Sequence, residues 1–142
     1  MNFEVRKCKK LTKVQARQMY DLFTANISAI CEETILTFYL NSEFVGATLI
    51  RYDEFDLYKG KHPGITPAFE VYINYFEVVK DHRGEGIGEA MFRWLEDNLN
   101  VFKFTLCHRD FSIDKKASYL FWRKMGFRKP NILFSEMEKV YK

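Results

Sequence analysis

Residues able to bind a phosphate group are concentrated near the middle of the chain. One arginine and three glycines lie within a short stretch: Arg83, Gly84, Gly86 and Gly88. Glycine permits backbone conformations that bring several amide groups to one side of a turn, and it leaves room for a ligand to approach them. A β-branched apolar segment, residues 71–79, precedes the glycines, and an amphipathic segment, residues 87–99, follows them. A strand, a glycine turn and a helix start whose unpaired amides carry positive partial charge together predict a binding site for a phosphate-containing ligand, with Arg83 as a charged donor.

The spacing of these residues distinguishes between known phosphate-binding loops. A P-loop ends in Gly-Lys-Ser/Thr, whereas Gly88 is followed here by Glu89 and Ala90, so a P-loop is excluded. A dinucleotide fingerprint needs glycine or alanine where Glu89 stands, although Asp110 lies near the distance expected for its ribose-binding acid. About thirty residues follow Asp110, which is too few to complete a doubly wound sheet. A dinucleotide-binding site is therefore the minor alternative.

Length and composition indicate one globular domain spanning residues 1–142. The chain is 47% hydrophobic and 29% charged, which is ordinary for a domain with a single core. Three widely spaced cysteines favour reduced thiols in a cytoplasmic protein over a disulfide framework or a metal site. The first residues lack the apolar core of a signal peptide, and no apolar run reaches the roughly 18 residues of a membrane span. Net charge +3 and basic residues without interleaved aromatics in segment 7–17 lead us to expect no nucleic-acid and no membrane partner.

Hydrophobic periodicity predicts alternating strands and helices. The predicted strands cover residues 3–8, 34–40, 44–52, 68–79, 101–107 and 132–140, and the predicted helices begin near Thr12, Ile87 and Asp114. Thr12 and Gln15 form a capping box at the start of the first helix. Its apolar face is predicted to contain Leu11, Val14, Met19, Leu22, Phe23 and Ile27. Gly46 is expected at a bulge or at a close approach of two backbones. Gly126 is expected to end the last helix as a left-handed C-cap. The last strand has three candidate core residues: Ile132, Phe134 and Met137.

The strand predicted at residues 68–79 has two unlike faces. One face is predicted to carry Val71, Ile73, Tyr75 and Val79, with Glu77 as its exception. The other face is predicted to carry Glu70, Tyr72, Asn74, Phe76 and Val78. The first is expected to face the core, and the second is suited to a cleft. A bulge would exchange the two faces for part of the strand.

Two motifs resemble those of the GNAT N-acetyltransferases. The first is R-x-x-G-x-G from Arg83 to Gly88, preceded by Val78, although Lys80 and Glu85 stand where the family often has proline and a basic residue. The second matches the family at Ser118, Phe121, Lys124, Gly126 and Phe127. The resemblance implies an α/β (α+β) fold with a mixed, mostly antiparallel sheet of about six or seven strands and helices on both faces. It also implies a splay between the two central parallel strands.

The resemblance implies acetyl-CoA as co-substrate, bound between strands that end near Val79 and His108, and no metal. Backbone groups of Val78, Val79 and Lys80 would hold the pantetheine arm. The pyrophosphate would lie on the loop formed by Arg83, Gly84, Glu85, Gly86, Ile87 and Gly88. Trp122 stands where the family usually has a tyrosine that protonates the leaving thiolate, so the resemblance implies that Trp122 contacts the cofactor. Tyr119, one helical turn earlier, is expected to substitute as that acid, while filling the core is the alternative role of Trp122.

The implied reaction is attack of an amine on the acetyl thioester. An alkyl amine has a pKa of about 10.4 and must lose a proton before it attacks, which requires a base. Glu70, Glu77 and His108 are the candidates, and Glu70 is favoured because it lies on the polar face of its strand. The acceptor is expected to be an amine of a small molecule or a peptide, and the acids of loop 53–67 favour a cationic one. The resemblance also allows a homodimer.

An alternative within the same family is a regulatory protein that binds CoA and has lost turnover. Trp122 and Glu85 favour this alternative, because both depart from residues that the family uses for catalysis and phosphate attraction.

Overall fold

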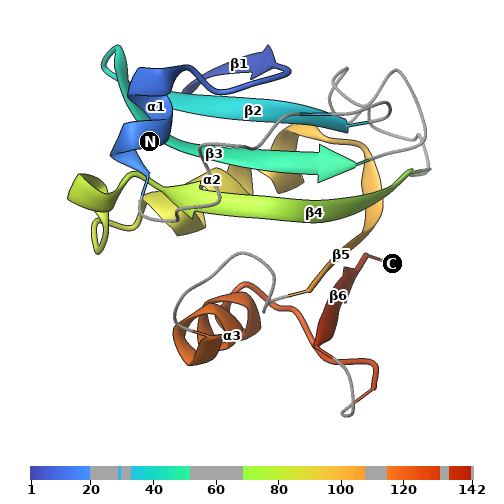
Figure 1. The fold of residues 1–142 in the computed structure, drawn as a ribbon. Helices are drawn as coiled ribbons and strands as arrows, with labels where there is room; N and C mark the ends of the chain where they lie inside the picture. Colours follow the sequence, from blue (N-terminus) through green and yellow to red (C-terminus); the bar gives the residue numbers. More distant parts are fainter. Residues whose placement is uncertain (20–28, 30–32, 52–68, 108–114, 132–134, 142) are drawn as a thin grey trace.

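The computed structural model describes residues 1–19, 29, 33–51, 69–107, 115–131 and 135–141. The strands are β1 (Glu4–Cys8), β2 (Glu33–Leu40), β3 (Glu43–Arg51), β4 (Phe69–Val78), β5 (Val101–Cys107) and β6 (Glu136–Val140). The helices are α1 (Lys13–Gln18), α2 (Ile87–Asn98) and α3 (Lys115–Lys124), and a 3-10 turn covers Lys80–His82. The strands form one sheet in the order β1-β2-β3-β4-β5-β6, in which β4 and β5 are parallel and the other neighbours antiparallel (Figure 1). This confirms the predicted mixed, mostly antiparallel sheet.

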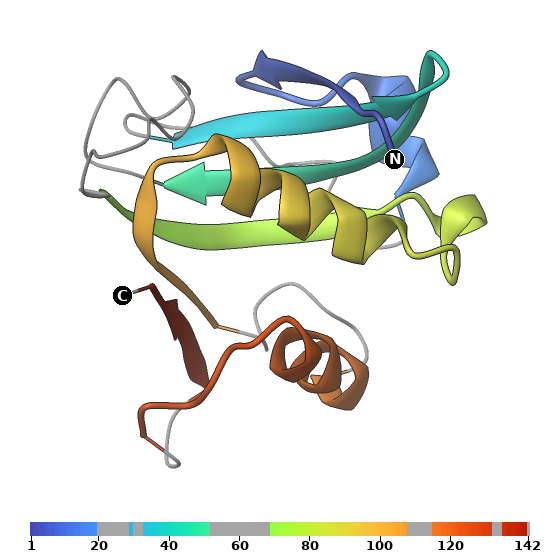
Figure 2. The same cartoon turned by 180° about the vertical axis from the view of Figure 1, so that it is seen from behind.

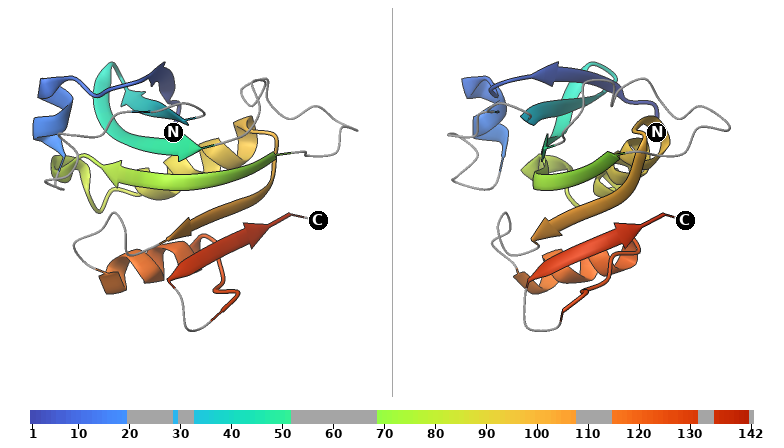
Figure 3. Two further views of the ribbon diagram at one scale, coloured as in Figure 1. Left: turned by 45° about the vertical axis from the view of Figure 1, so that its right-hand side comes forward. Right: turned by 90° about the vertical axis from the view of Figure 1, so that its right-hand side faces the viewer.

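Helices lie on both faces of this sheet, as expected. α2 crosses the face turned toward the viewer in Figure 2, and α1 lies on the opposite face. α3 lies beside β5 and β6 in both views of Figure 3. The position of α2 follows from the topology, because two parallel neighbouring strands need a crossover and a helix is the usual one.

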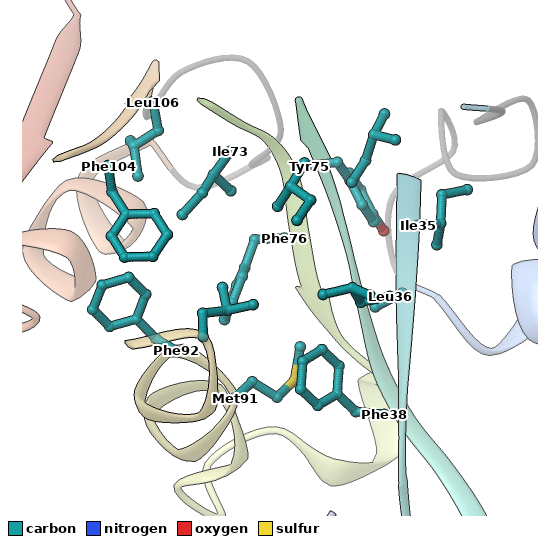
Figure 4. Close-up of a cluster of buried hydrophobic side chains, with 14 of the residues drawn as sticks. Ile35, Leu36, Phe38, Ile73, Tyr75, Phe76, Met91, Phe92, Phe104 and Leu106 are labelled. Carbon is teal, nitrogen blue, oxygen red and sulfur yellow. The ribbon is translucent and has the colours of Figure 1, made fainter. Parts of the chain in front are cut away.

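The main core lies between the sheet and α2 (Figure 4). The rings of Phe92 and Phe104 meet edge to face with centroids 5.4 Å apart, and Ile73 points toward them. Met91 lies against Phe38 of β2, so the helix covers the sheet from β5 to β2. All five side chains are fully buried, and each contributes about 1.5–3 kcal/mol of hydrophobic stabilisation.

Gly46 lies at a bulge and at a close approach, as predicted. The register between β2 and β3 shifts by one residue beside it. A Cβ atom added to Gly46 would lie 2.5 Å from Met91 Sδ and 2.9 Å from the carbonyl oxygen of Glu77. Glycine at this position therefore lets α2 pack directly on the backbone of β3.

α1 is shorter than predicted, and one of its predicted core residues is exposed. The capping box is confirmed, since Gln15 N donates to Thr12 Oγ1 at 3.1 Å and Thr12 N donates to Gln15 Oε1 at 2.9 Å. Leu11 and Met19, on either side of the helix, are buried, whereas Val14 is 65% exposed. The prediction for Val14 was wrong because a helix of six residues is fixed by its flanks and has no continuous apolar stripe. The predicted core residues Leu22, Phe23 and Ile27 lie outside the described residues.

β4 contains a bulge at Asn74. Tyr75 pairs with Leu49 of β3 while Ile73 pairs with Ile50, so one residue of β4 is inserted between two consecutive residues of its partner. An inserted residue reverses the alternation of side chains for the rest of the strand.

The bulge corrects the predicted faces of β4 beyond residue 74. Phe76, predicted on the polar face, packs against Trp122 with ring centroids 5.0 Å apart and points toward α2 in Figure 4. Tyr75 and Glu77, predicted beside Ile73, lie on the other face, where the Tyr75 hydroxyl donates to the Glu77 carboxylate. The predicted faces are confirmed as far as Ile73 and wrong for residues 75–78.

The end of α3 is fixed by a glycine in the left-handed conformation, as predicted. Gly126 has φ +99°, and its N–H donates to Arg123 O at 3.0 Å, while Phe127 N–H donates to Trp122 O at 2.9 Å. These two bonds form a Schellman motif, which turns Phe127 back onto Trp122. Met137 of β6 is fully buried, as predicted, while Asp114, Ile132 and Phe134 lie outside the described residues.

Candidate active site

The two parallel strands β4 and β5 separate in the middle of the sheet. Their pairing ends where Ile73 faces Leu106, yet β4 continues to Val78 with β3 as its partner. Figure 1 shows β5 turning away from β4 beyond this point. The divergence begins at the bulge residue Asn74, so the segment of β4 beyond it has backbone groups on the side that β5 has left. The predicted splay is confirmed.

The glycine loop lies at the end of this separated segment. Gly84 and Gly86 have φ +81° and +79°, and a Cβ added to either would meet no atom of the described structure within 4 Å. Gly86 is the N-cap of α2 without a side-chain cap, and the first helical bond runs from Ala90 N to Gly86 O. The amides of the first turn therefore point out of the helix, which is the arrangement that binds phosphate. The space over both glycines is open in the described structure, as the predicted pyrophosphate site requires.

Gly88 allows close packing, whereas the two glycines before it allow an open backbone with positive φ. A Cβ at Gly88 would lie 3.3 Å from Phe121 Cε1 and 3.5 Å from Val78 Cγ2. The missing side chain therefore brings the first turn of α2 close to both α3 and β4.

The residues predicted to hold the pantetheine arm differ in the hydrogen bonds and the direction of their backbone groups. Val79 N–H donates to Val45 O at 2.8 Å, and Val79 O accepts from His82 N at 2.9 Å, so both backbone groups of Val79 are already bonded. Because amide directions alternate along a strand, the backbone of Val78 is directed toward the side that β5 has left. A contribution to pantetheine binding stays a prediction for Val78, Val79 and Lys80, and the backbone of Val78 is the one directed toward the separated side.

Arg83 makes an ion pair with a buried carboxylate. Its Nη2 donates to Glu77 Oε1 at 2.8 Å, and the Tyr75 hydroxyl donates to the other carboxylate oxygen. The Glu77 side chain is 4% exposed and the Arg83 side chain 48% exposed. Tyr75 was absent from the sequence-based site, and the only signal for it was a tyrosine two residues before a glutamate on one strand.

His82 connects the glycine loop to the beginning of β3. Its Nε2 lies 2.8 Å from Glu43 Oε1, and its Nδ1 lies 3.0 Å from Glu85 Oε1. The hydrogen bond with Glu43, and then that with Glu85, raises the pKa of His82 above its ordinary value, against the opposing effect of desolvation. The Glu85 side chain therefore points toward His82, and the predicted place of Glu85 in the pyrophosphate site stays a prediction.

We expect this His82 bridge to weaken as the pH rises. A pKa raised by folding means that the bridge contributes fully below the ordinary histidine pKa of about 6.5 and is lost as the pH passes the higher folded value. Neutral imidazole retains one N–H and can donate to one carboxylate at a time. An NMR titration should give His82 a lower pKa in Glu43→Gln than in the unmodified protein. Equal values in both proteins would show that Glu43 does not hold the imidazolium.

The predicted catalytic residues that the structure describes lie on β4 and α3. Glu70 is on the paired part of β4, before the splay, with its side chain 50% exposed and 3.9 Å from Lys103 Nζ. Glu77 lies beyond the bulge, on the same face as Glu70. Tyr119 is half-buried on α3, and His108 lies outside the described residues. The structure brings Glu77 close to the glycine loop and leaves Glu70 at the far end of the strand.

Trp122 lies inside an aromatic cluster. It is 1% exposed, and four rings meet it at centroid distances of 4.8–5.7 Å: Phe76, Phe92, Phe121 and Phe127. This packing supports the predicted alternative of a core side chain. Contact with the cofactor stays a prediction for Trp122.

Comparison with known proteins agrees with this fold and loop. Residues 4–127 match the acetyltransferase (GNAT) family, so the chain belongs to that family. No curated protein matches the chain by sequence. None of the helices in the described ranges is both long and apolar enough to cross a membrane.

Three solved structures share the fold at low sequence identity. YhhK from E. coli bound to coenzyme A has a TM-score of 0.65 at 13% identity, covering 99% of both chains. The N-acetyltransferase YlbP of Bacillus subtilis, in complex with coenzyme A, has a TM-score of 0.57 at 11% identity, covering 98% of this chain and 97% of its own. KacTA, in complex with DNA, has a TM-score of 0.59 at 9% identity, covering 98% of this chain and 93% of its own. Because a protein of this fold is found with DNA, the expected absence of a nucleic-acid partner stays a prediction.

Proposed function

We propose that this chain is an N-acetyltransferase that moves an acetyl group from acetyl-CoA to a primary amine by direct attack in a ternary complex. The observation that carries the proposal is the pair of open, positive-φ glycines at the uncapped start of α2, next to the point where β4 and β5 separate. Acetyl-CoA supplies the acetyl thioester. The chain itself supplies amides for the pyrophosphate, backbone groups of β4 for the pantetheine arm, and a geometry that holds amine and thioester together.

The amine has to be deprotonated by a group of this chain or by a water chain leading to one. Glu70, Glu77 and His108 remain the candidates for that base, and Tyr119 the candidate acid for the leaving thiolate. The half-exposed carboxylate of Glu70 and the acids of loop 53–67, which lies outside the described residues, favour a cationic amine in a small molecule or a peptide. A thiol leaving group has a pKa of about 8.5, so departure without an acid is tolerable.

Thermal unfolding with and without acetyl-CoA, with NAD as control, tests the cofactor. At 100 times its dissociation constant a ligand adds about 2.7 kcal/mol, which should raise Tm on the order of 5–10 °C. A shift with acetyl-CoA alone supports the proposal, whereas a shift with NAD alone would replace it by the dinucleotide alternative.

Release of the CoA thiol then tests turnover against a panel of amines. Polyamines, aminoglycosides and lysine peptides should give release, and neutral amines should give less. Binding of acetyl-CoA without release on any amine would favour the second candidate, a CoA-binding regulatory protein, which the buried Trp122 in the place of the family's tyrosine supports.

A further inference from the structure

We propose that Glu77 is a positioning residue, which holds Arg83 and thereby keeps the glycine loop in the conformation that receives the pyrophosphate of acetyl-CoA. Arg83 is then an anchor of the loop, and the phosphate is bound by backbone amides. This inference rests on the proposed function for its cofactor. It assigns to Glu77 and Arg83 roles other than those of base and phosphate donor.

The first support is the burial of the Glu77 carboxylate. Its side chain is 4% exposed, one oxygen accepts from Arg83 Nη2 at 2.8 Å, and the other accepts from the Tyr75 hydroxyl. A buried carboxylate is costly unless it is paired and hydrogen-bonded. The bulge at Asn74 is what turns Glu77 toward this side of β4. The pair is therefore fixed by the strand and is not a chance contact of two surface side chains.

The second support is the place of Arg83 in the chain. It follows the 3-10 turn Lys80–His82 and directly precedes Gly84, so it is the last residue with a side chain before the first positive-φ position. Glycines have more conformational freedom to lose than other residues, and both loop glycines are exposed. A charge-assisted hydrogen bond of the Arg83 side chain restrains the backbone directly before these two flexible glycines.

The third support is the energetic cost that Arg83 would incur as a phosphate donor. A guanidinium that turned away to the phosphate would give up its hydrogen bond to the buried Glu77 carboxylate, and removing one partner of a buried ion pair is unfavourable. Glu85, the residue between the two loop glycines, is itself acidic and bonds to His82. Arg83 and Glu85 are therefore poorly suited to bind a phosphate through their side chains. The open backbone amides at Gly84, Gly86 and the start of α2 are better placed to donate to it.

Calorimetric titration of acetyl-CoA into Glu77→Gln distinguishes the anchor from the other roles. If Glu77 is an anchor, Glu77→Gln should weaken acetyl-CoA binding about tenfold, which equals about 1.4 kcal/mol. If Arg83 were a phosphate donor held back by Glu77, the same change would leave binding unaltered or tighten it. If Glu77 were the base, kcat would fall while Kd stayed the same. Either of these two results would overturn the proposal.

The two residues should also act as one unit. Arg83→Gln should weaken acetyl-CoA binding to a similar extent, and the double variant should be no weaker than the worse single variant. Additive losses would contradict an anchor made by the pair. Glu4→Gln is the matched control, because Glu4 pairs with Arg6 at 2.6 Å on β1, at the far edge of the sheet.

Hydrogen exchange of the loop amides tests the anchor without any cofactor. In the unliganded protein, the amides of residues 84–88 should exchange about tenfold faster in Glu77→Gln than in the unmodified chain, and in Glu4→Gln at the unmodified rate. Unchanged exchange would overturn the anchor. Since this readout does not need acetyl-CoA, a failure of the proposed function and a failure of the anchor give different results.

Discussion

Trp122→Ala is expected to lower the free energy of unfolding by about 3–5 kcal/mol, the cost of deleting a large buried aromatic side chain. Trp122 is 1% exposed, and four phenylalanine rings meet it between α2, α3 and β4. The Schellman bonds at the end of α3 leave these rings little freedom to close the cavity. For a domain of this size the loss should lower Tm by about 10–15 °C in a calorimetric scan.

Trp122→Phe separates packing from chemistry at the same position. It keeps a ring in the cluster, so we expect a stability loss well below that of alanine, and kcat within twofold of the unmodified enzyme. A fall in kcat beyond tenfold at nearly unchanged Tm would show that the indole N–H assists the leaving thiolate. That result would contradict the purely structural role that the burial of Trp122 indicates.

Gly86→Ala is expected to weaken acetyl-CoA binding at least tenfold while the fold survives. Gly86 has φ +79°, a conformation that costs an alanine roughly 1–2 kcal/mol, and Tm should fall by only a few degrees. A Cβ there enters space that is open in the protein and that we propose the pyrophosphate occupies. Isothermal titration and a thermal scan measure the two effects on one sample.

Two further variants show which property of Gly86 matters. Gly86→Asn adopts positive φ with less strain, so loss of binding in both variants would identify bulk at the phosphate position as the cause. Gly46→Ala is the contrasting variant, expected to lower Tm more than Gly86→Ala does. Its Cβ would lie 2.9 Å from the Glu77 carbonyl oxygen, which belongs to the backbone and cannot easily move. Unchanged acetyl-CoA affinity in Gly86→Ala would contradict the assignment of the loop.

Features set by a few neighbouring residues were predictable from the sequence. The capping box of Thr12 and Gln15, the C-cap at Gly126 and the glycine loop before α2 all appear where expected. In each case the signal is local, since a special backbone conformation or a bond across three or four residues demands a particular residue type. The element order followed from these signals and from hydrophobic periodicity, whereas the family resemblance rested on the two motifs at residues 83–88 and 118–127.

Tertiary structure alone decided the details of the site. The bulge at Asn74 arises from pairing with β3, a strand more than twenty residues away in the chain, and it determines which face Glu77 occupies. The partner of Arg83 and the burial of Trp122 follow from that choice of face and from the docking of α3. Sequence by itself determined which backbone conformations the chain adopts locally, while contacts between distant segments determined where its charged and aromatic side chains point. The physical reason is that periodicity counts residues along one strand, whereas an inserted residue becomes visible only against the register of its neighbour.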